Sequence, residues 1–315
     1  MISYIVRRLL QAIPTLFIAS VAVWALVYAL PGDPVLTLLG PEPNPEAVIA
    51  ERARLGLDQP IYAQYFTWLG NVFQGDLGYS YFGGEAVLDR IQRRVMPTLQ
   101  LGGFALIVAI LLALPIASFG SLKPNSFAGR AVSVQSVLSL SLPTFWVGIL
   151  FILFFAVKWR LLPAVSDYHP FLRDPAAAFR NTVLPGLTLG IYVSAIFGRF
   201  LRQSLTEVLN KDYVRTARSK GLKETVVVGR HALRNALLPF VTILGLQVSG
   251  FISGSVVTES VFSYPGVGRL VYTAILQRDY ALIQGTTLLI VVAVTVINLI
   301  VDIIYAYLDP RISYS

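Results

Sequence analysis

Residues 280–301 read YALIQGTTLLIVVAVTVINLIV, a run that contains no charged side chain. A helix that crosses a bilayer needs about 20 consecutive apolar residues, and its backbone groups must be hydrogen-bonded within the segment. This run is long and apolar enough, and a helix is the structure that satisfies its backbone, so it predicts a membrane-spanning helix. It belongs to a chain of 315 residues that is 55% hydrophobic and only 13% charged, with a mean hydropathy of +0.67. Such a composition favours an integral membrane protein.

Five other charge-free runs have a similar length. They are Leu9–Leu30, Val95–Leu122, Ala131–Val157, Thr182–Gly198 and Asn235–Thr258. None alternates between polar and apolar residues as the strands of a membrane barrel do. The first run follows Arg7 and Arg8, and we expect it to be a retained span and not a signal peptide. The sequence therefore predicts an all-α polytopic membrane protein with six transmembrane helices.

The positive charges indicate the orientation. An even number of spans places both termini on one side, and the segments of that side carry 14 of the 25 Lys and Arg residues. Nine of these 14 lie in residues 199–234, whereas residues 31–97 carry eight acidic side chains. Basic residues favour cytoplasmic loops. We therefore expect both termini and the basic segment in the cytoplasm, with residues 31–97 outside, and the excess of positive charge gives no reason to expect nucleic-acid binding.

The basic segment shows a helix–turn–helix pattern. Leu205, Val208 and Leu209 have the spacing of one helix face, which Ala217 extends. Gly221 stands where a helix ends, because glycine readily adopts the left-handed conformation that follows a C-terminus. Residues 222–225 then open a second helix that carries Val226–Val228. One interpretation is an amphipathic hairpin on anionic membrane lipid; the other is a docking element for a partner protein.

The same segment resembles the EAA loop of ABC importer permeases. Arg215-Thr216-Ala217 is followed after three residues by Gly221, and after nine more by His231-Ala232-Leu233. The usual form has Glu-Ala-Ala, an apolar residue and Pro where this chain has Arg215-Thr216-Ala217, His231 and Arg234. In that family the loop forms a coupling helix that docks into a groove of the ATPase. The resemblance implies a coupling loop at about 204–234. Its site residues would be Arg215, Thr216, Ala217, Lys220, Gly221, Leu222, Lys223 and Glu224.

Further motifs resemble the dipeptide and oligopeptide permeases of this family. They are LPGDP at 30–34, LGLDQP at 55–60, QYFTW at 64–68, GDLGYS at 75–80, ARSKGL at 217–222, RHALRNALLP at 230–239, ESVFSYPGVGRL at 259–270, RDY at 278–280 and VDIIYAYLDPRI at 301–312. The resemblance implies the type I ABC importer permease fold and a place in the bacterial inner membrane. It also implies a division into residues 1–97, with the first helix and a long outer segment, and a five-helix core at 98–315.

Such a permease subunit works with partners. The resemblance implies a second homologous permease, two ATPase subunits and an extracytoplasmic peptide-binding protein. No phosphate-loop motif occurs, since no Gly is followed by Lys, so ATP and Mg are expected on the ATPase subunits and no cofactor on this chain. The chain has no cysteine and two distant histidines, His169 and His231. We therefore expect no metal site and no catalytic residue in this chain.

Three features leave alternatives open. Gln247 and Asn298 are polar residues within apolar runs, and either line the translocation path or hydrogen-bond neighbouring helices. Residues 31–97 either dock the binding protein or form a cap whose aromatic side chains lie at the membrane interface. Glu259 and Asp302 lie at span ends, where they either mark an ion pathway or have a structural role. In the structural interpretation, Asp302 and residues 309–311 fix the last helix near the cytoplasmic surface.

The resemblance thus implies the permease subunit of an ATP-driven importer for dipeptides or oligopeptides, forming half of the translocation pathway. The same subfamily also imports nickel complexes, glutathione and oligosaccharides, which are the alternative cargoes. An ion-coupled secondary transporter would favour repeated halves and ionisable residues at mid-membrane. A polytopic membrane enzyme would need catalytic chemistry that the motifs do not supply.

Overall fold

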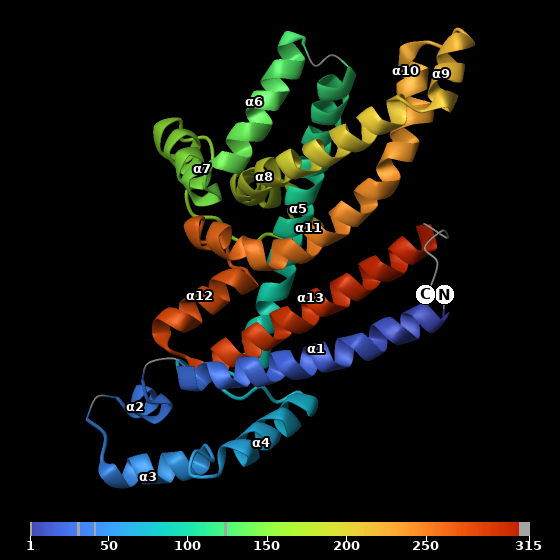
Figure 1. The fold of residues 1–315 in the computed structure, drawn as a ribbon. Coiled ribbons are helices and arrows are strands. Elements are labelled where there is room, and N and C mark those ends of the chain that lie inside the picture. Colours follow the sequence, from blue (N-terminus) through green and yellow to red (C-terminus); the bar gives the residue numbers. More distant parts are fainter. Residues whose placement is uncertain (1, 30–31, 41, 123–124, 309–315) are drawn as a thin grey trace. The chain divides into compact units, whose positions relative to one another are not determined.

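The computed structural model describes residues 2–29, 32–40, 42–122 and 125–308, which are almost entirely helical (Figure 1). The helices are α1 (Ile2–Ala29), α2 (Pro34–Leu39), α3 (Pro45–Arg54), α4 (Ile61–Phe73), α5 (Val87–Leu122), α6 (Phe127–Ser141), α7 (Thr144–Phe151), the π-helix η1 (Ile152–Lys158), α8 (Pro175–Leu209), α9 (Asp212–Ser219), α10 (Glu224–Val226), the π-helix η2 (Val227–Leu233), α11 (Arg234–Val261), α12 (Val267–Gln277) and α13 (Tyr280–Leu308). Within the described ranges the only β-pairing is an isolated bridge between Tyr79 and Ala86.

Most of the expected membrane helices are present in the described residues. Four helices of the described chain are long and apolar enough to cross a membrane, in the segments Ile5–Leu26, Val87–Leu122, Pro175–Leu209 and Tyr280–Ile304. A bent pair, Ser133–Ser141 with Thr144–Lys158, brings the number to five. The remaining predicted run, Asn235–Thr258, forms α11, although several of its side chains lie outside the described set. The prediction of an all-α polytopic membrane protein is confirmed.

The predicted helix in the run Ala131–Val157 is not continuous. The chain turns by 102° between α6 and the α7–η1 helix. The turn lies at Leu142, whose backbone is extended with φ −87° and ψ 133°, directly before Pro143. The residue before a proline is driven out of the helical region by the pyrrolidine ring, and proline itself has no N–H to continue a helix. The Leu142-Pro143 pair is therefore sufficient to explain the break in the helix.

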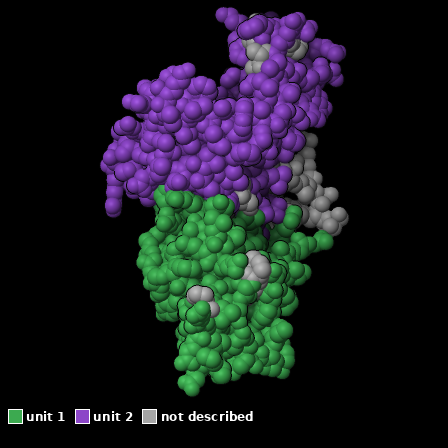
Figure 2. Space-filling view, turned by 90° about the vertical axis from the view of Figure 1, so that its left-hand side faces the viewer, with its two compact units in different colours: residues 1–98, 265–296 green, residues 99–264, 297–315 purple. Residues whose placement is uncertain are grey.

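The described helices form two compact units, shown separately coloured in Figure 2. Unit 1 consists of residues 1–98 and 265–296, and unit 2 of residues 99–264 and 297–315. Unit 1 is therefore discontinuous in sequence, because the start of α13 belongs with the N-terminal third of the chain. The predicted division into 1–97 and 98–315 remains a prediction.

In unit 1, α4 packs on α1 through aromatic side chains. Tyr65 is buried between Phe17 and Trp24, with ring centroids at 6.4 and 5.6 Å, and its hydroxyl is 2.8 Å from the hydroxyl of Ser20. A second cluster joins α5, α12 and α13; its buried members are Val87, Ile91, Leu270, Ala274, Leu282 and Ile283. Residues 31–97 thus fold onto helices of unit 1 through α4 and the start of α5.

In unit 2, small residues let α5 and α8 approach closely. Fully buried alanines recur every fourth residue on α5, at Ala105, Ala109, Ala113 and Ala117. On α8, a Cβ atom added at Gly190 would lie 2.6 Å from Val108 Cγ1 and 2.9 Å from the Ala105 carbonyl oxygen. Membrane helices associate largely through such close backbone packing. The α5–α8 pair is therefore a closely packed part of unit 2.

Candidate functional site

The basic segment forms a folded lobe that includes the end of α8, hereafter the basic lobe (residues 204–234; Figure 1). Val214 and Ala217 of α9 and Val227 of η2 are buried in one cluster, and Val208 and Leu209 of α8 pack against it. One detail of the prediction is wrong: Ala217 does not continue the α8 face, because the chain leaves the helix at residues 210–211 before α9 begins. A separate helix instead folds Ala217 back onto Val208 and Leu209.

Gly221 ends α9 as predicted. Its φ is +75°, and its N–H donates to the carbonyl of Arg218 at 2.9 Å. A Cβ atom at this position would meet no atom within 4 Å. Glycine is required here by the left-handed backbone and not by lack of space, since residues with a Cβ adopt that conformation at a cost of about 1–2 kcal/mol.

An ion pair bridges the turn at Gly221. Arg218 Nη2 donates to Glu224 Oε1 at 2.6 Å, and Arg218 Nε donates to Glu224 Oε2 at 3.2 Å. This two-bonded geometry holds the end of α9 against the start of α10. The hydrogen bond from Arg218 lowers the pKa of the Glu224 carboxyl, and the bond to Glu224 raises the pKa of Arg218. Both groups are exposed, so water weakens the pair.

The structure brings most of the predicted coupling residues to one exposed tip. Seven of them are exposed there: Arg215, Thr216, Lys220, Gly221, Leu222, Lys223 and Glu224. Ala217 is buried and supports the tip from inside. Sequence reasoning missed Arg218, although its charge is opposite to that of Glu224 and the two stand three residues before and after Gly221.

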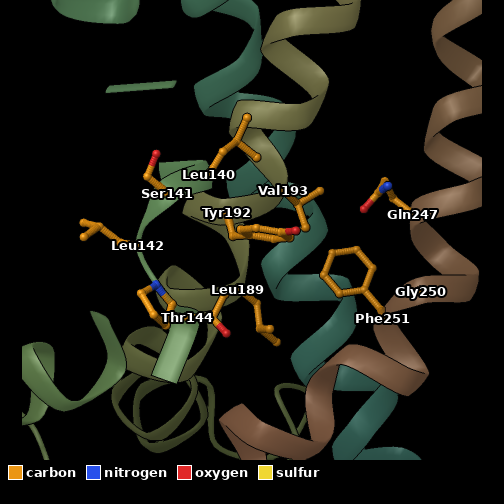
Figure 3. A pocket seen from close by; sticks show the side chains of 11 residues that line it. Leu140, Ser141, Leu142, Thr144, Leu189, Tyr192, Val193, Gln247, Gly250 and Phe251 are labelled. Atoms are coloured by element: carbon orange, nitrogen blue, oxygen red, sulfur yellow. The ribbon is translucent and has the colours of Figure 1, made fainter. Parts of the chain in front are cut away.

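A second candidate site is a pocket of about 440 Å³ within unit 2 (Figure 3). It lies at the break between α6 and α7, with α8 and α11 forming its other walls. Its lining residues are Leu140, Ser141, Leu142, Pro143, Thr144, Leu189, Tyr192, Val193, Gln247, Gly250 and Phe251. The amide of Gln247 is directed from α11 toward Tyr192 and Val193 of α8.

The two polar residues singled out from the sequence therefore lie in different surroundings. Gln247 lines the pocket, and in the described part of the chain its amide makes no hydrogen bond. Asn298 does not line it; its Oδ1 accepts a hydrogen bond from the Ser249 hydroxyl at 2.5 Å, which joins α13 to α11. The contact at Asn298 therefore favours a role in hydrogen bonding between neighbouring helices. The cavity at Gln247 favours a role in lining the translocation path.

The acidic residues predicted at span ends differ in burial. Glu259 is fully buried near the end of α11, and Asp302 is half-buried in α13. In the ranges that the structure covers, no group of three His, Cys, Asp or Glu side chains is placed to hold a metal ion. The predicted fixing role of residues 309–311 lies outside the described residues.

The comparisons with known proteins define the class. Residues 105–314 match the family described as "Binding-protein-dependent transport system inner membrane component". Residues 1–102 match the corresponding N-terminal family, described as "Binding-prot-dependent transport system membrane comp, N-term". The chain belongs to this family of inner-membrane transport components.

Its relatives and structural neighbours narrow the class further. The glutathione transport system permease protein GsiC of Escherichia coli (strain K12) is 41% identical over 100% of both chains. GsiC of Shigella flexneri serotype 5b (strain 8401) is 40% identical over the same extent. Inward-facing structures of the MetNI methionine ABC transporter match with a TM-score of 0.58 and 16% identity, over 70% of this chain and 96% of that one. An amino acid ABC transporter with histidines matches with a TM-score of 0.52 and 17% identity, over 71% and 94%.

The fold is thus that of a type I ABC importer permease, and the chain is a permease subunit of an ABC importer. It is an integral inner-membrane protein with several apolar helices. As a member of this class, it functions with a partner permease, ATPase subunits and a substrate-binding protein.

Proposed function

We propose that this chain forms half of the membrane pathway of an ATP-driven importer of short peptides, with glutathione as the first cargo to test. The support for a peptide cargo is the 41% identity to permeases named for glutathione, which is itself a tripeptide. Dipeptides and longer oligopeptides follow from the sequence motifs as further cargoes. In this proposal the partner ATPase subunits bind ATP and Mg and carry out hydrolysis, and this chain contributes no catalytic residue.

The observation that carries the coupling proposal is the pair of helical connections between the basic lobe and the pocket. From Tyr192 at the pocket, α8 continues without a break to Leu209, inside the lobe. On the return path, η2 passes directly into α11, which carries Gln247. At 1.5 Å per residue, the α8 connection is about 25 Å long. The Ser204 hydroxyl, which donates to the Ala236 carbonyl at 3.0 Å, ties the two helices near the lobe.

The continuous helices between the lobe and the pocket are suited to transmit a movement of the lobe to the pocket. Two ATPase subunits that close on ATP would displace the exposed tip at Gly221, and α8 and α11 would carry this displacement to the pocket. A stiff, packed element can bias two positions of the pathway, whereas a flexible tether would lose that bias. The buried cluster of Val214, Ala217 and Val227 gives the lobe this stiffness. The concentration of basic residues in the lobe favours a cytoplasmic position, with both termini on the same side.

The partner outside the membrane is proposed to dock on residues 31–97. Exposed aromatic side chains on α4 support this, notably Tyr62, Phe66 and Phe73. The alternative is a cap at the membrane interface. Deletion of residues 41–75 separates the two: weakened association of the binding protein with the purified complex supports docking, and unchanged association supports the cap.

Purification and reconstitution test the proposed function. The chain is co-expressed with its partners and isolated in mild detergent, where we expect a second permease and ATPase subunits to co-elute. Reconstituted with the binding protein, the complex should import labelled glutathione or dipeptides only with ATP, in competition with longer peptides but not with nickel complexes or oligosaccharides. Peptide uptake by the isolated chain under a proton gradient would contradict the proposal in favour of a secondary transporter.

A further inference from the structure

The pocket lies at the middle of three apolar segments. Its lining residues 140–144 are central in the charge-free run 131–157, residues 189–193 in the run 182–198, and residues 247–251 in the run 235–258. A span places its central residues near the middle of the bilayer. The runs 182–198 and 235–258 lie in the continuous helices α8 and α11, so these two spans bring their centres to one cavity, which locates the pocket near membrane mid-depth.

The backbone at the pocket indicates what kind of molecule occupies it. The extended Leu142 and the following Pro143 interrupt the helix there. Backbone outside a helix is tolerated at membrane depth only where it is covered by protein or lines a water-filled cavity, because lipid offers no hydrogen-bonding partner. The break therefore favours an aqueous or polar occupant over a lipid chain.

The lining selects a neutral polar group. No Asp, Glu, Lys, Arg or His is among the lining residues. Gln247 supplies an amide with both donor and acceptor atoms, and Tyr192 a hydroxyl; neither group makes a hydrogen bond within the described ranges. A peptide bond offers the matching C=O and N–H. The Phe251 ring stands beside Gln247 and adds an apolar surface for the atoms next to that bond (Figure 3).

The size of the pocket fits a small ligand. Its volume of about 440 Å³ lies within the range of about 300–1,000 Å³ for small-molecule sites. Without an ion pair, the binding is weak enough for the cargo to leave, as transport requires. We propose that this pocket is a transient mid-membrane site for a backbone amide of the peptide cargo, held by Gln247 and Tyr192. This inference rests on the proposed function, because it assumes a peptide cargo.

Uptake kinetics of variants test the site in the complete reconstituted transporter. Gln247→Leu removes the amide, and Tyr192→Phe removes the hydroxyl. Since one hydrogen bond contributes about 0.5–1.5 kcal/mol, each change should lower the uptake rate at limiting cargo roughly fivefold. Leu246→Ala is the control, since Leu246 is exposed on α11 and does not line the pocket. Its uptake should stay within about twofold of the wild type.

A labelling experiment tests the same site independently of the uptake kinetics. It remains informative even if Gln247→Leu or Tyr192→Phe assembles poorly. The chain has no cysteine, so Gln247→Cys introduces a unique thiol, whose modification by a small polar reagent is followed by mass spectrometry of this chain. Glutathione is itself a thiol, so a dipeptide serves as cargo. Cargo trapped in the transporter should slow labelling at least threefold, with no effect on Leu246→Cys. Suppose that the wild-type complex imports peptide, that Gln247→Leu has unchanged uptake kinetics, and that cargo does not protect Gln247→Cys from labelling. That result would overturn the proposed site but not the proposed function. Failure of the wild-type complex to import any peptide would overturn the proposed function and the site with it.

Discussion

The Ser80 hydroxyl donates a hydrogen bond to the buried carboxylate of Asp279, 199 positions further along the chain. Arg90 joins the pair: its Nη1 donates to the Ser80 oxygen and lies 3.8 Å from Asp279 Oδ2. Asp279 Oδ1 also accepts from the N–H of Leu282 at 3.2 Å, near the start of α13. Burial raises the pKa of the adjacent Tyr81 to about 12, and the charge of Asp279 adds to this. The motifs GDLGYS and RDY thus meet in one polar cluster of unit 1.

Removal of this carboxylate should destabilise unit 1. Asp279→Ala removes the acceptor of the Ser80 hydroxyl and of the Leu282 N–H, and the negative charge beside Arg90. An unsatisfied buried polar group costs about 1–3 kcal/mol. Thermal unfolding of the purified protein in detergent measures the loss. Asp58→Asn, at an exposed position of the same unit, should change stability by less than about 0.5 kcal/mol. Equal unfolding temperatures for Asp279→Ala and wild type would show that the cluster does not stabilise the unit.

Two glycines of unit 2 should respond oppositely to alanine. Gly190→Ala forces a methyl group to within 2.9 Å of the Ala105 carbonyl oxygen, and overpacking of this kind costs about 1–3 kcal/mol. Gly103→Ala places its methyl group where no atom lies within 4 Å. Because alanine favours the helix over glycine, this change should be neutral or stabilise by up to about 1 kcal/mol. A chemical denaturation series in detergent compares them, and similar effects of both would argue against close α5–α8 packing.

Gly221→Asp should separate ATP hydrolysis from transport. The substitution strains a backbone with φ +75° by about 1–2 kcal/mol and adds an acid to the basic tip. We expect the protein to insert and assemble, with peptide uptake largely lost while the ATPase subunits still hydrolyse ATP. Parallel measurement of uptake and ATPase rate in proteoliposomes provides the check. Normal uptake by this variant would show that the tip at Gly221 does not couple ATP hydrolysis to transport.

The proposed orientation can be measured with single introduced thiols, since the chain has no cysteine of its own. The Lys220→Cys variant, changed at the exposed lobe, should react with a membrane-impermeant maleimide only after the inner membrane is opened. The Asn71→Cys variant, changed at an exposed position of α4, should react in intact spheroplasts. Reaction of the Lys220→Cys variant in intact spheroplasts would place the lobe outside and remove the basis for ATPase coupling.

The pair Arg218–Glu224 should stabilise the lobe only above acidic pH. The pKa of Glu224 is lowered in the folded protein, so the stabilisation is fully present above its ordinary value of about 4.3 and is lost as the pH falls through the lowered one. Because the pair is exposed, Glu224→Gln should cost only about 0.2–1 kcal/mol at pH 7. Hydrogen exchange of α9 amides would detect this difference, which should shrink as the pH falls below about 4. A constant difference at all pH values would contradict the ion pair.

Local patterns in the sequence were sufficient for the helices and the turn of the lobe. The charge-free runs required helices in lipid, and Gly221 required a left-handed turn whatever its partners were. The break before Pro143 follows from local sterics too, but the long apolar run hid it. The Ser80–Asp279 contact and the cavity at Gln247 depend on which distant segments pack together. Periodicity carries no information about such pairings, so only the structure reveals them.

The discontinuity of unit 1 also has a consequence for biosynthesis. Asp279 leaves the ribosome 199 residues after Ser80, which at about 5–20 residues per second is a delay of roughly 10–40 s. During that interval the N-terminal third exists without Asp279, so Ser80 and Arg90 lack the carboxylate that they contact in the folded unit. A truncated nascent chain that stops before residue 265 should therefore be a preferred substrate for membrane quality-control proteases.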